Sequence, residues 1–164
     1  MKKNLILLMA ILVCMPLFAG SKNKANKDTE HFRYELECAG NGTQGTYLIK
    51  VWSYSRNKNV AMEQCKKNAV HGVIFKGFSG GDGCVGQRAL VSKPGVEAEY
   101  KDFFAQFFSD KGEYYKYVSL TSAPSEIVKV GKEYKVGMIV TIQKDELRKA
   151  LEQAGIIRGL NSGF

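Results

Sequence analysis

An apolar run near the N-terminus indicates the compartment in which this chain folds. The compartment in turn decides whether its cysteines can form a disulfide. Residues 1–4 include two lysines, and the apolar run Leu5–Phe18 is shorter than the roughly 20 residues of a membrane-spanning helix. The small residues Ala19 and Gly20 follow it. This pattern predicts a signal peptide over residues 1–19, cleaved after Ala19 or Gly20, and a periplasmic or secreted protein.

A lipid anchor is the alternative use of this segment. Cys14 could accept a lipid, but the bulky Val13 stands just before it, where lipoprotein signals carry a small residue. We therefore expect cleavage without lipidation and no membrane-spanning segment in the mature chain. Residues 20–30 are rich in Lys, Asn and Asp and lack apolar periodicity, so they are expected to form a flexible leader.

Three cysteines remain after cleavage, which allows one intramolecular disulfide and leaves one thiol. Cys65 falls on the apolar face of a predicted helix, where a free thiol packs as a small hydrophobic group. Cys38 ends a predicted strand, and Cys84 lies in a glycine-rich segment. In an oxidising compartment we expect a Cys38–Cys84 disulfide, which would close a long loop and stabilise the fold.

Alternating apolar and polar residues predict four strands. In the first of them Tyr34 and Leu36 share one face, while Glu35 and Glu37 share the other. The predicted strands cover residues 31–39, 46–55, 114–121 and 133–143. A glycine-containing turn joins the first two as an antiparallel hairpin, and residues 122–131 are expected to be a connection.

Apolar residues at helical spacing predict three helices, over residues 57–76, 96–109 and 144–154. In the first, Asn57 or Asn59 can cap the N-terminus and Gly77 can end the helix. The second carries the strongest amphipathic pattern, a stripe formed by Tyr100, Phe103, Phe104, Phe107 and Phe108. The glycine-rich residues 78–95 are expected to form a long loop tied down by the disulfide.

These elements follow the order β-β-α-α-β-β-α and predict the α+β class. The expected architecture is a mainly antiparallel sheet of about four strands with helices packed on one face. A single domain is expected over residues 31–158, because the whole chain has 164 residues and one domain usually spans roughly 100–200. Residues 159–164 are expected to be a tail.

One set of residues could form a nucleophilic site: Cys84, His71 and Asp82. His71 falls on the polar face of its helix, which indicates a solvated surface histidine. Cys84 is the expected disulfide partner of Cys38. The sequence therefore predicts no catalytic residue and no enzyme, and a small cysteine hydrolase is the least favoured alternative.

Metal and cofactor binding are not expected either. The two histidines, His31 and His71, stand forty residues apart, and no Cys-x-x-Cys motif occurs. The glycine-rich segment lacks the Gly-Lys-Ser/Thr ending of a phosphate-binding loop, and it follows a helix instead of preceding one. We expect no metal site and no cofactor.

Aromatic and basic side chains suggest a binding surface. Trp52, Tyr54 and Lys50 share one strand face, and three tyrosines lie near residue 115, so a face of the sheet could stack sugars. Removing Lys2 and Lys3 with the signal peptide leaves 22 of the 24 basic residues against 16 acidic ones, a net charge of +6. The charge is scattered along the chain, and an exported protein rarely meets nucleic acid, so no nucleic-acid partner is expected.

Two segments resemble a known family. Residues 61–70 place alanines every few positions in a helix after a strand pair, and the alternating residues 133–142 run directly into the helix that begins near residue 144. This pattern resembles the N-terminal domain of flagellar assembly protein T and related small envelope lipoproteins, which pack helices on an antiparallel sheet. The resemblance implies a non-catalytic envelope module that contacts other proteins or cell-wall components.

Two functions remain open at this point. The first is an exported, non-enzymatic interaction or structural module of the cell envelope. The second is a module that binds a glycan or another anionic polymer through Trp52, Tyr54 and Lys50, helped by the net positive charge.

Overall fold

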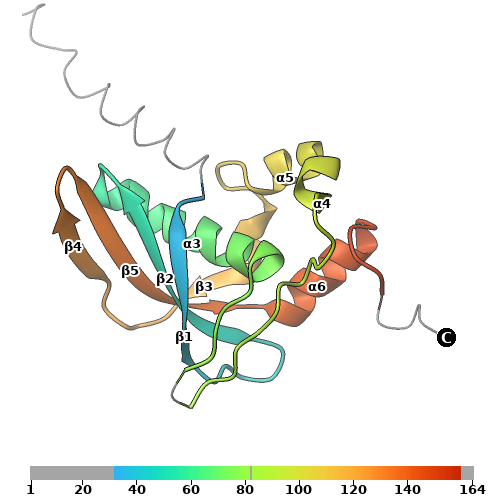
Figure 1. Cartoon of the computed structure of the whole chain (residues 1–164), viewed down its shortest axis with the longest axis horizontal. Coiled ribbons are helices and arrows are strands. Elements are labelled where there is room, and N and C mark those ends of the chain that lie inside the picture. The colour runs from blue at the N-terminus through green and yellow to red at the C-terminus, as the bar shows by residue number, and fades with distance from the viewer. Residues whose placement is uncertain (1–31, 82, 160–164) are drawn as a thin grey trace, which may run out of the picture.

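In the part of the chain that the structure describes, a five-stranded antiparallel sheet carries four helices and a short 3-10 helix. Figure 1 shows their arrangement. The computed structural model describes residues 32–81 and 83–159. The predicted signal peptide, the leader and all but the first residue of the tail lie outside the described residues, as do Cys14, His31 and Asp82. The α+β class predicted from the sequence is confirmed.

The elements follow the predicted order, but the second helix is divided in two and a 3-10 helix and a further strand are added. They are β1 (Tyr34–Gly40), β2 (Tyr47–Ser55), α3 (Lys58–Phe75), α4 (Val96–Glu99), α5 (Lys101–Phe107), the 3-10 helix η2 (Glu113–Tyr117), β3 (Val118–Leu120), β4 (Glu126–Val130), β5 (Glu133–Ile142) and α6 (Lys144–Gln153). The strands lie in the order β1-β2-β5, and the far side of β5 is shared by β3 and β4. β5 is thus the centre of the sheet.

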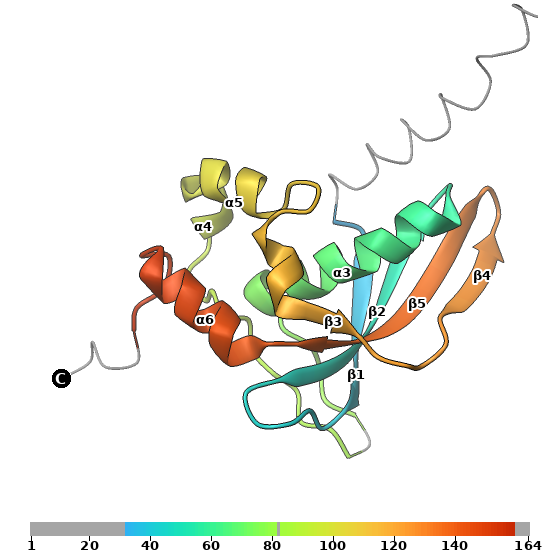
Figure 2. The same cartoon turned by 180° about the vertical axis from the view of Figure 1, so that it is seen from behind.

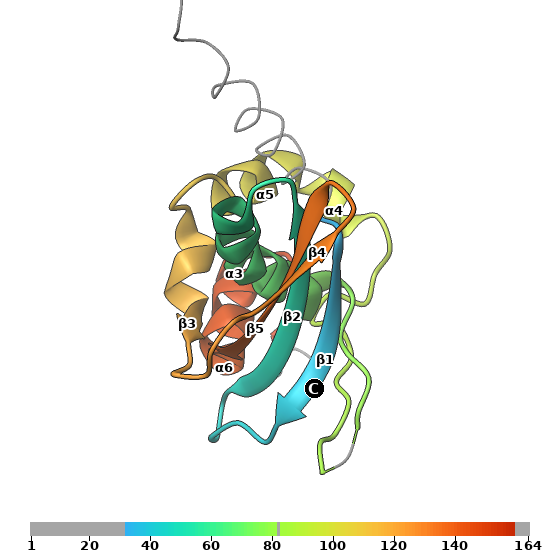
Figure 3. The ribbon, with the colours of Figure 1, turned by 90° about the vertical axis from the view of Figure 1, so that its left-hand side faces the viewer.

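The longest helix, α3, lies on one side of this sheet, and in Figure 3 it is seen with α6 to the left of β2 and β1. α3 packs against β2 and β5, and its Asn57 cap accepts a hydrogen bond from the Asn59 backbone N–H at 3.0 Å. Cys65 lies beneath β2 and β5 as a free buried thiol, and burial raises its pKa to about 11. Asn68 donates to the Ser53 hydroxyl at 2.8 Å, which satisfies both buried polar groups.

The second predicted helix is two helices. The backbone leaves the helical region at Tyr100, between α4 and α5, and the Tyr100 hydroxyl donates to the Gly155 carbonyl at 3.1 Å. The expected aromatic stripe still forms the core contact, because Phe104, Phe107 and Phe108 are buried. The break lets this segment wrap over α3 and reach α6 in the same layer.

Two further expectations were wrong. The predicted third strand, residues 114–121, begins as the helix η2 and becomes β3 only at Val118, because Tyr114 turns into the core beside Phe108. The expected connection at 122–131 contains a fifth strand, β4. Gly131 and Lys132 form a two-residue turn between β4 and β5, and the positive φ of Gly131 (60°) suits the first position of a type II′ hairpin.

The glycine-rich segment lies along the free edge of β1. The sulfur atoms of Cys38 and Cys84 are at bonding distance with a Cα–Cα separation of 6.1 Å, as predicted. Phe78 pairs with Gln87 across the segment, and Tyr47 of β2 donates to the Gln87 side chain at 3.0 Å. Figure 3 shows this segment, in light green, beside β1. The disulfide therefore fastens this segment to the C-terminal end of β1.

Replacing both Cys38 and Cys84 with alanine should destabilise the fold by about 3–4 kcal/mol, because the bond closes a loop with a sequence separation of 46. The free energy of unfolding by urea would measure this loss. Thiol counting on the mature protein, from which the signal peptide with Cys14 has been cleaved, should find one free thiol, accessible only after unfolding. A disulfide that contains Cys65 would contradict the assignment.

Candidate interaction site

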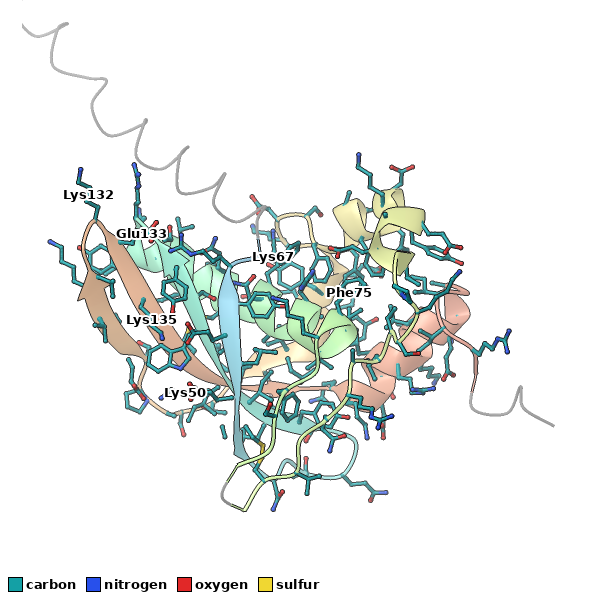
Figure 4. All side chains as sticks on the ribbon, in the orientation of Figure 1. Lys50, Lys67, Phe75, Lys132, Glu133 and Lys135 are labelled. Atoms are coloured by element: carbon teal, nitrogen blue, oxygen red, sulfur yellow. A yellow bond between two sulfur atoms is a disulfide. The ribbon has the colours of Figure 1, made fainter. Side chains whose placement is uncertain are left out.

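The residues predicted to bind a ligand lie together on the face of the sheet that faces away from the helices. Lys50, Trp52 and Tyr54 of β2 are half-buried there, while Val51 and Ser53 point toward α3. The ammonium groups of Lys50 and Lys135 lie 4.4 and 4.7 Å from the centre of the Trp52 ring. Figure 4 labels both lysines on this outer face. The three residues therefore share one face of β2, as the alternation in the sequence predicts.

Gly137 explains how the Trp52 ring fits against the sheet. The two residues are directly opposite across the β2–β5 pairing. A Cβ atom on Gly137 would lie 2.6 Å from ring atom Cζ3, closer than van der Waals contact allows. The absence of a side chain on β5 therefore lets the indole lean over the neighbouring strand, and its Nε1–H donates to Glu37 of β1 at 2.9 Å.

The charges of the outer face are paired. Lys50 pairs with Glu126 at 2.6 Å, Arg33 pairs with Glu133, and Lys135 donates to Glu35 at 2.8 Å. The hydrogen bonds from Lys135 and from the Tyr54 hydroxyl lower the pKa of the Glu35 carboxyl. These cations face carboxylates, so this face offers little net positive charge to an anionic polymer.

The outermost strand, β4, is the most exposed apolar feature of the sheet. All five of its residues are exposed, and Ile127, Val128 and Val130 keep 45%, 49% and 51% of their surface accessible. Within the described part of the chain, β4 pairs with β5 alone. In Figure 2, seen from behind, the β4–β5 hairpin extends beyond the helices, and in Figure 4 the labelled Lys132 and Glu133 mark its tip. β4 therefore presents both apolar side chains and an unpaired backbone edge.

A groove of about 930 Å³ lies between the first half of α3 and residues 110–115. Tyr115, 45% exposed, lines it together with Asn57, Glu63 and Asp110. Lys66 donates to the Tyr115 hydroxyl at 2.7 Å and is itself largely buried. The tyrosines near residue 115 thus lie on the helical side of the sheet and not on the outer face with Trp52.

The thiol of the possible nucleophilic set is not free. Cys84 is the disulfide partner of Cys38, and Asp82 lies outside the described residues. The prediction that His71 is a solvated surface residue was wrong, because its exposed fraction is 4%. The α4–α5 segment covers the face of α3 that the sequence pattern marked as polar.

His71 joins three parts of the fold. Its Nε2–H donates to Glu97 of α4 at 3.1 Å, so Nδ1 accepts from the Tyr34 hydroxyl of β1 at 2.7 Å. The ring of Phe32 stacks on the imidazole with centroids 3.6 Å apart, and Phe75 and Phe108 lie beside it. Burial lowers the pKa of His71, although the hydrogen bond that His71 donates to the Glu97 carboxylate opposes this. The neutral imidazole fits this environment.

Gly137→Ala should displace the Trp52 ring and cost on the order of 1 kcal/mol of stability. Trp52 is the single tryptophan, so its emission should shift toward that of a solvated indole. Gly81→Ala is the matched control, because its added Cβ would meet no atom within 4 Å. The cost should vanish in a Trp52→Ala background, and a cost that persists there would show that the ring contact is not its cause.

The stability of the protein should fall on acidification because of His71. Its folded-state pKa lies below the unfolded value of 6.5, so the unfolded chain binds more protons as the pH drops through that value, and folding weakens. Thermal unfolding between about pH 7.5 and 5.5 should show this loss in the native sequence and less of it in His71→Gln.

Among residues 32–81 and 83–159, no cluster of three or more His, Cys, Asp or Glu side chains could hold a metal ion, and no helix has the length and hydropathy to cross a membrane. No family model, curated protein or solved structure matches the chain.

Proposed function

We propose that this chain is an exported, non-enzymatic module of the bacterial cell envelope that binds protein partners through the open edge of β4. The observation that carries the proposal is the contrast between the two edges of the sheet. The glycine-rich segment, fastened by Cys38–Cys84, lies along β1, while β4 exposes Ile127, Val128 and Val130 beside an unpaired backbone. Exposed apolar edge strands are templates for the addition of another strand.

Export is supported by the chemistry of the cysteine pair. A disulfide persists in an oxidising compartment such as the periplasm or the exterior of the cell, and is rare in the cytosol. The predicted signal peptide over residues 1–19 points to the same route. A bond of this kind would keep the glycine-rich segment fastened to β1 in the envelope.

Recognition of a glycan or another anionic polymer is the second candidate. Trp52 and Tyr54 lie side by side on the outer face, and Tyr115 lines the groove along α3. The second candidate ranks lower because Lys50 already pairs with Glu126, and because lysine ammonium groups occupy positions over the Trp52 ring that a sugar would need.

A photo-crosslinking side chain at position 128, incorporated in cells that export the protein, should yield a discrete protein adduct. The same side chain at position 85 is the matched control, because Val85 is 72% exposed but lies in the glycine-rich segment, away from β4. A Val130→Lys change should suppress the adduct at 128, because it charges the edge. Equal labelling at both positions, or no adduct at 128, would refute the proposal.

A further inference from the structure

We propose that the partner of β4 is β4 of a second copy of this chain, so that two sheets join into one continuous antiparallel sheet about a two-fold axis. The inference deepens the proposed function, since it rests on β4 as the binding edge and names the partner. Three observations support it. They concern the backbone groups of β4 that face outward, the side chains that would lie opposite each other, and the strands that would form the outer edges of the joined sheet.

The hairpin turn determines which backbone groups of β4 are available. Residues that flank a two-residue turn form a hydrogen-bonded pair, here Val130 with Glu133, and such pairs alternate along an antiparallel ladder. Val128 therefore bonds toward β5, with Lys135 as its partner. The N–H and C=O groups of Ile127 and Lys129 point toward the free edge, where another strand can bind them.

A two-fold pairing centred on Val128 uses these groups. It places Ile127 opposite Lys129 of the second copy, and Lys129 opposite Ile127 of the second copy, each as a hydrogen-bonded pair. The two Val128 residues then face each other as a non-hydrogen-bonded pair, in which side chains approach closest. This register matches all five residues of β4 with five of the second copy.

The side chains of β4 are compatible with this register. On the outer face Val128 meets Val128 of the second copy, and Val130 meets the stem of Glu126. On the inner face the aliphatic stem of Lys129 covers Ile127. No two like charges stand directly opposite, which an antiparallel pair requires for stability. If the two-fold axis passed through Lys129 instead of Val128, Lys129 would lie opposite Lys129 of the second copy. Two ammonium groups would then face each other.

A two-fold dimer is a closed assembly of two copies, which favours pairing with a second copy over open-ended association through other edges. A two-fold interface uses the same edge of both molecules, so the association stops at a dimer. The outer ends of the joined sheet would be the two β1 strands, each with the glycine-rich segment beside it. Pairing β4 with β4 would therefore cover the aliphatic edge that β4 exposes.

The register can be tested with the mature protein carrying Val128→Cys. Cα atoms of a non-hydrogen-bonded pair lie about 4.5 Å apart, within the range that a disulfide can bridge. Mild oxidation should link the variant into a covalent dimer, whereas Val130→Cys, which would face Glu126, should link poorly. Cys65 does not compete, because it is buried and its thiol pKa is raised to about 11.

Sedimentation velocity across the micromolar range measures the association itself. The native sequence should dimerise, and Val128→Lys should raise the dissociation constant at least about tenfold, because it sets two charges opposite each other. Val85→Lys makes the same change in charge on an exposed residue elsewhere and should leave the dimer intact. Unchanged thermal unfolding of both variants shows that the fold is preserved.

Two results would overturn self-pairing. One is a native protein that stays monomeric, and the other is a dimer that Val128→Lys does not weaken. If the native protein is monomeric but the crosslinker at position 128 still captures another protein of the envelope, the proposed function stands and self-pairing fails. If neither association occurs, both proposals fail.

Discussion

The pairing of β2 with β5 is the constraint on which the rest of the structure depends. It joins segments about ninety residues apart in the chain, from Tyr47 opposite Ile142 to Ser55 opposite Tyr134, without a bulge. Because successive side chains alternate, this register puts Val51 and Val136 under α3 and leaves Lys50 and Lys135 on the outer face. A slip of one residue would exchange the two faces and bury the charges.

The helical layer is built on that register. α3 is buried on nearly every side over its second half, because β2 and β5 lie beneath it and the α4–α5 segment lies above. That is why a histidine on its apparently polar face becomes a core residue. His71 satisfies both ring nitrogens with Tyr34 and Glu97, so the polar group is compatible with its burial and links the sheet to the upper layer.

The sequence pattern predicted the features that depend on residues close together in the chain, and the cysteine count predicted the disulfide. The faces of β1 and β5, the capped helix α3 and the free Cys65 follow from periodicity, and the Cys38–Cys84 pair follows from elimination among three cysteines. What the patterns missed depends on neighbours distant in sequence. β4 is five residues between Pro124 and Gly131, and it becomes a strand through pairing with β5. The break at Tyr100 likewise coincides with a hydrogen bond from its hydroxyl to the distant Gly155 carbonyl, which no pattern within the helix reveals.

The two edges of the sheet connect the fold with the proposed role. A chain that needed only to stay soluble would gain from covering or charging both edges, since an aliphatic edge invites association. Here a disulfide and a long glycine-rich segment are committed to β1, whereas β4 carries aliphatic side chains on both of its faces. The Lys50–Glu126 pair and the Trp52 ring over Gly137 brace the outer face right up to β4. A braced strand loses little conformational freedom when it pairs, so the same network that neutralises the outer face is compatible with the proposed pairing of its edge.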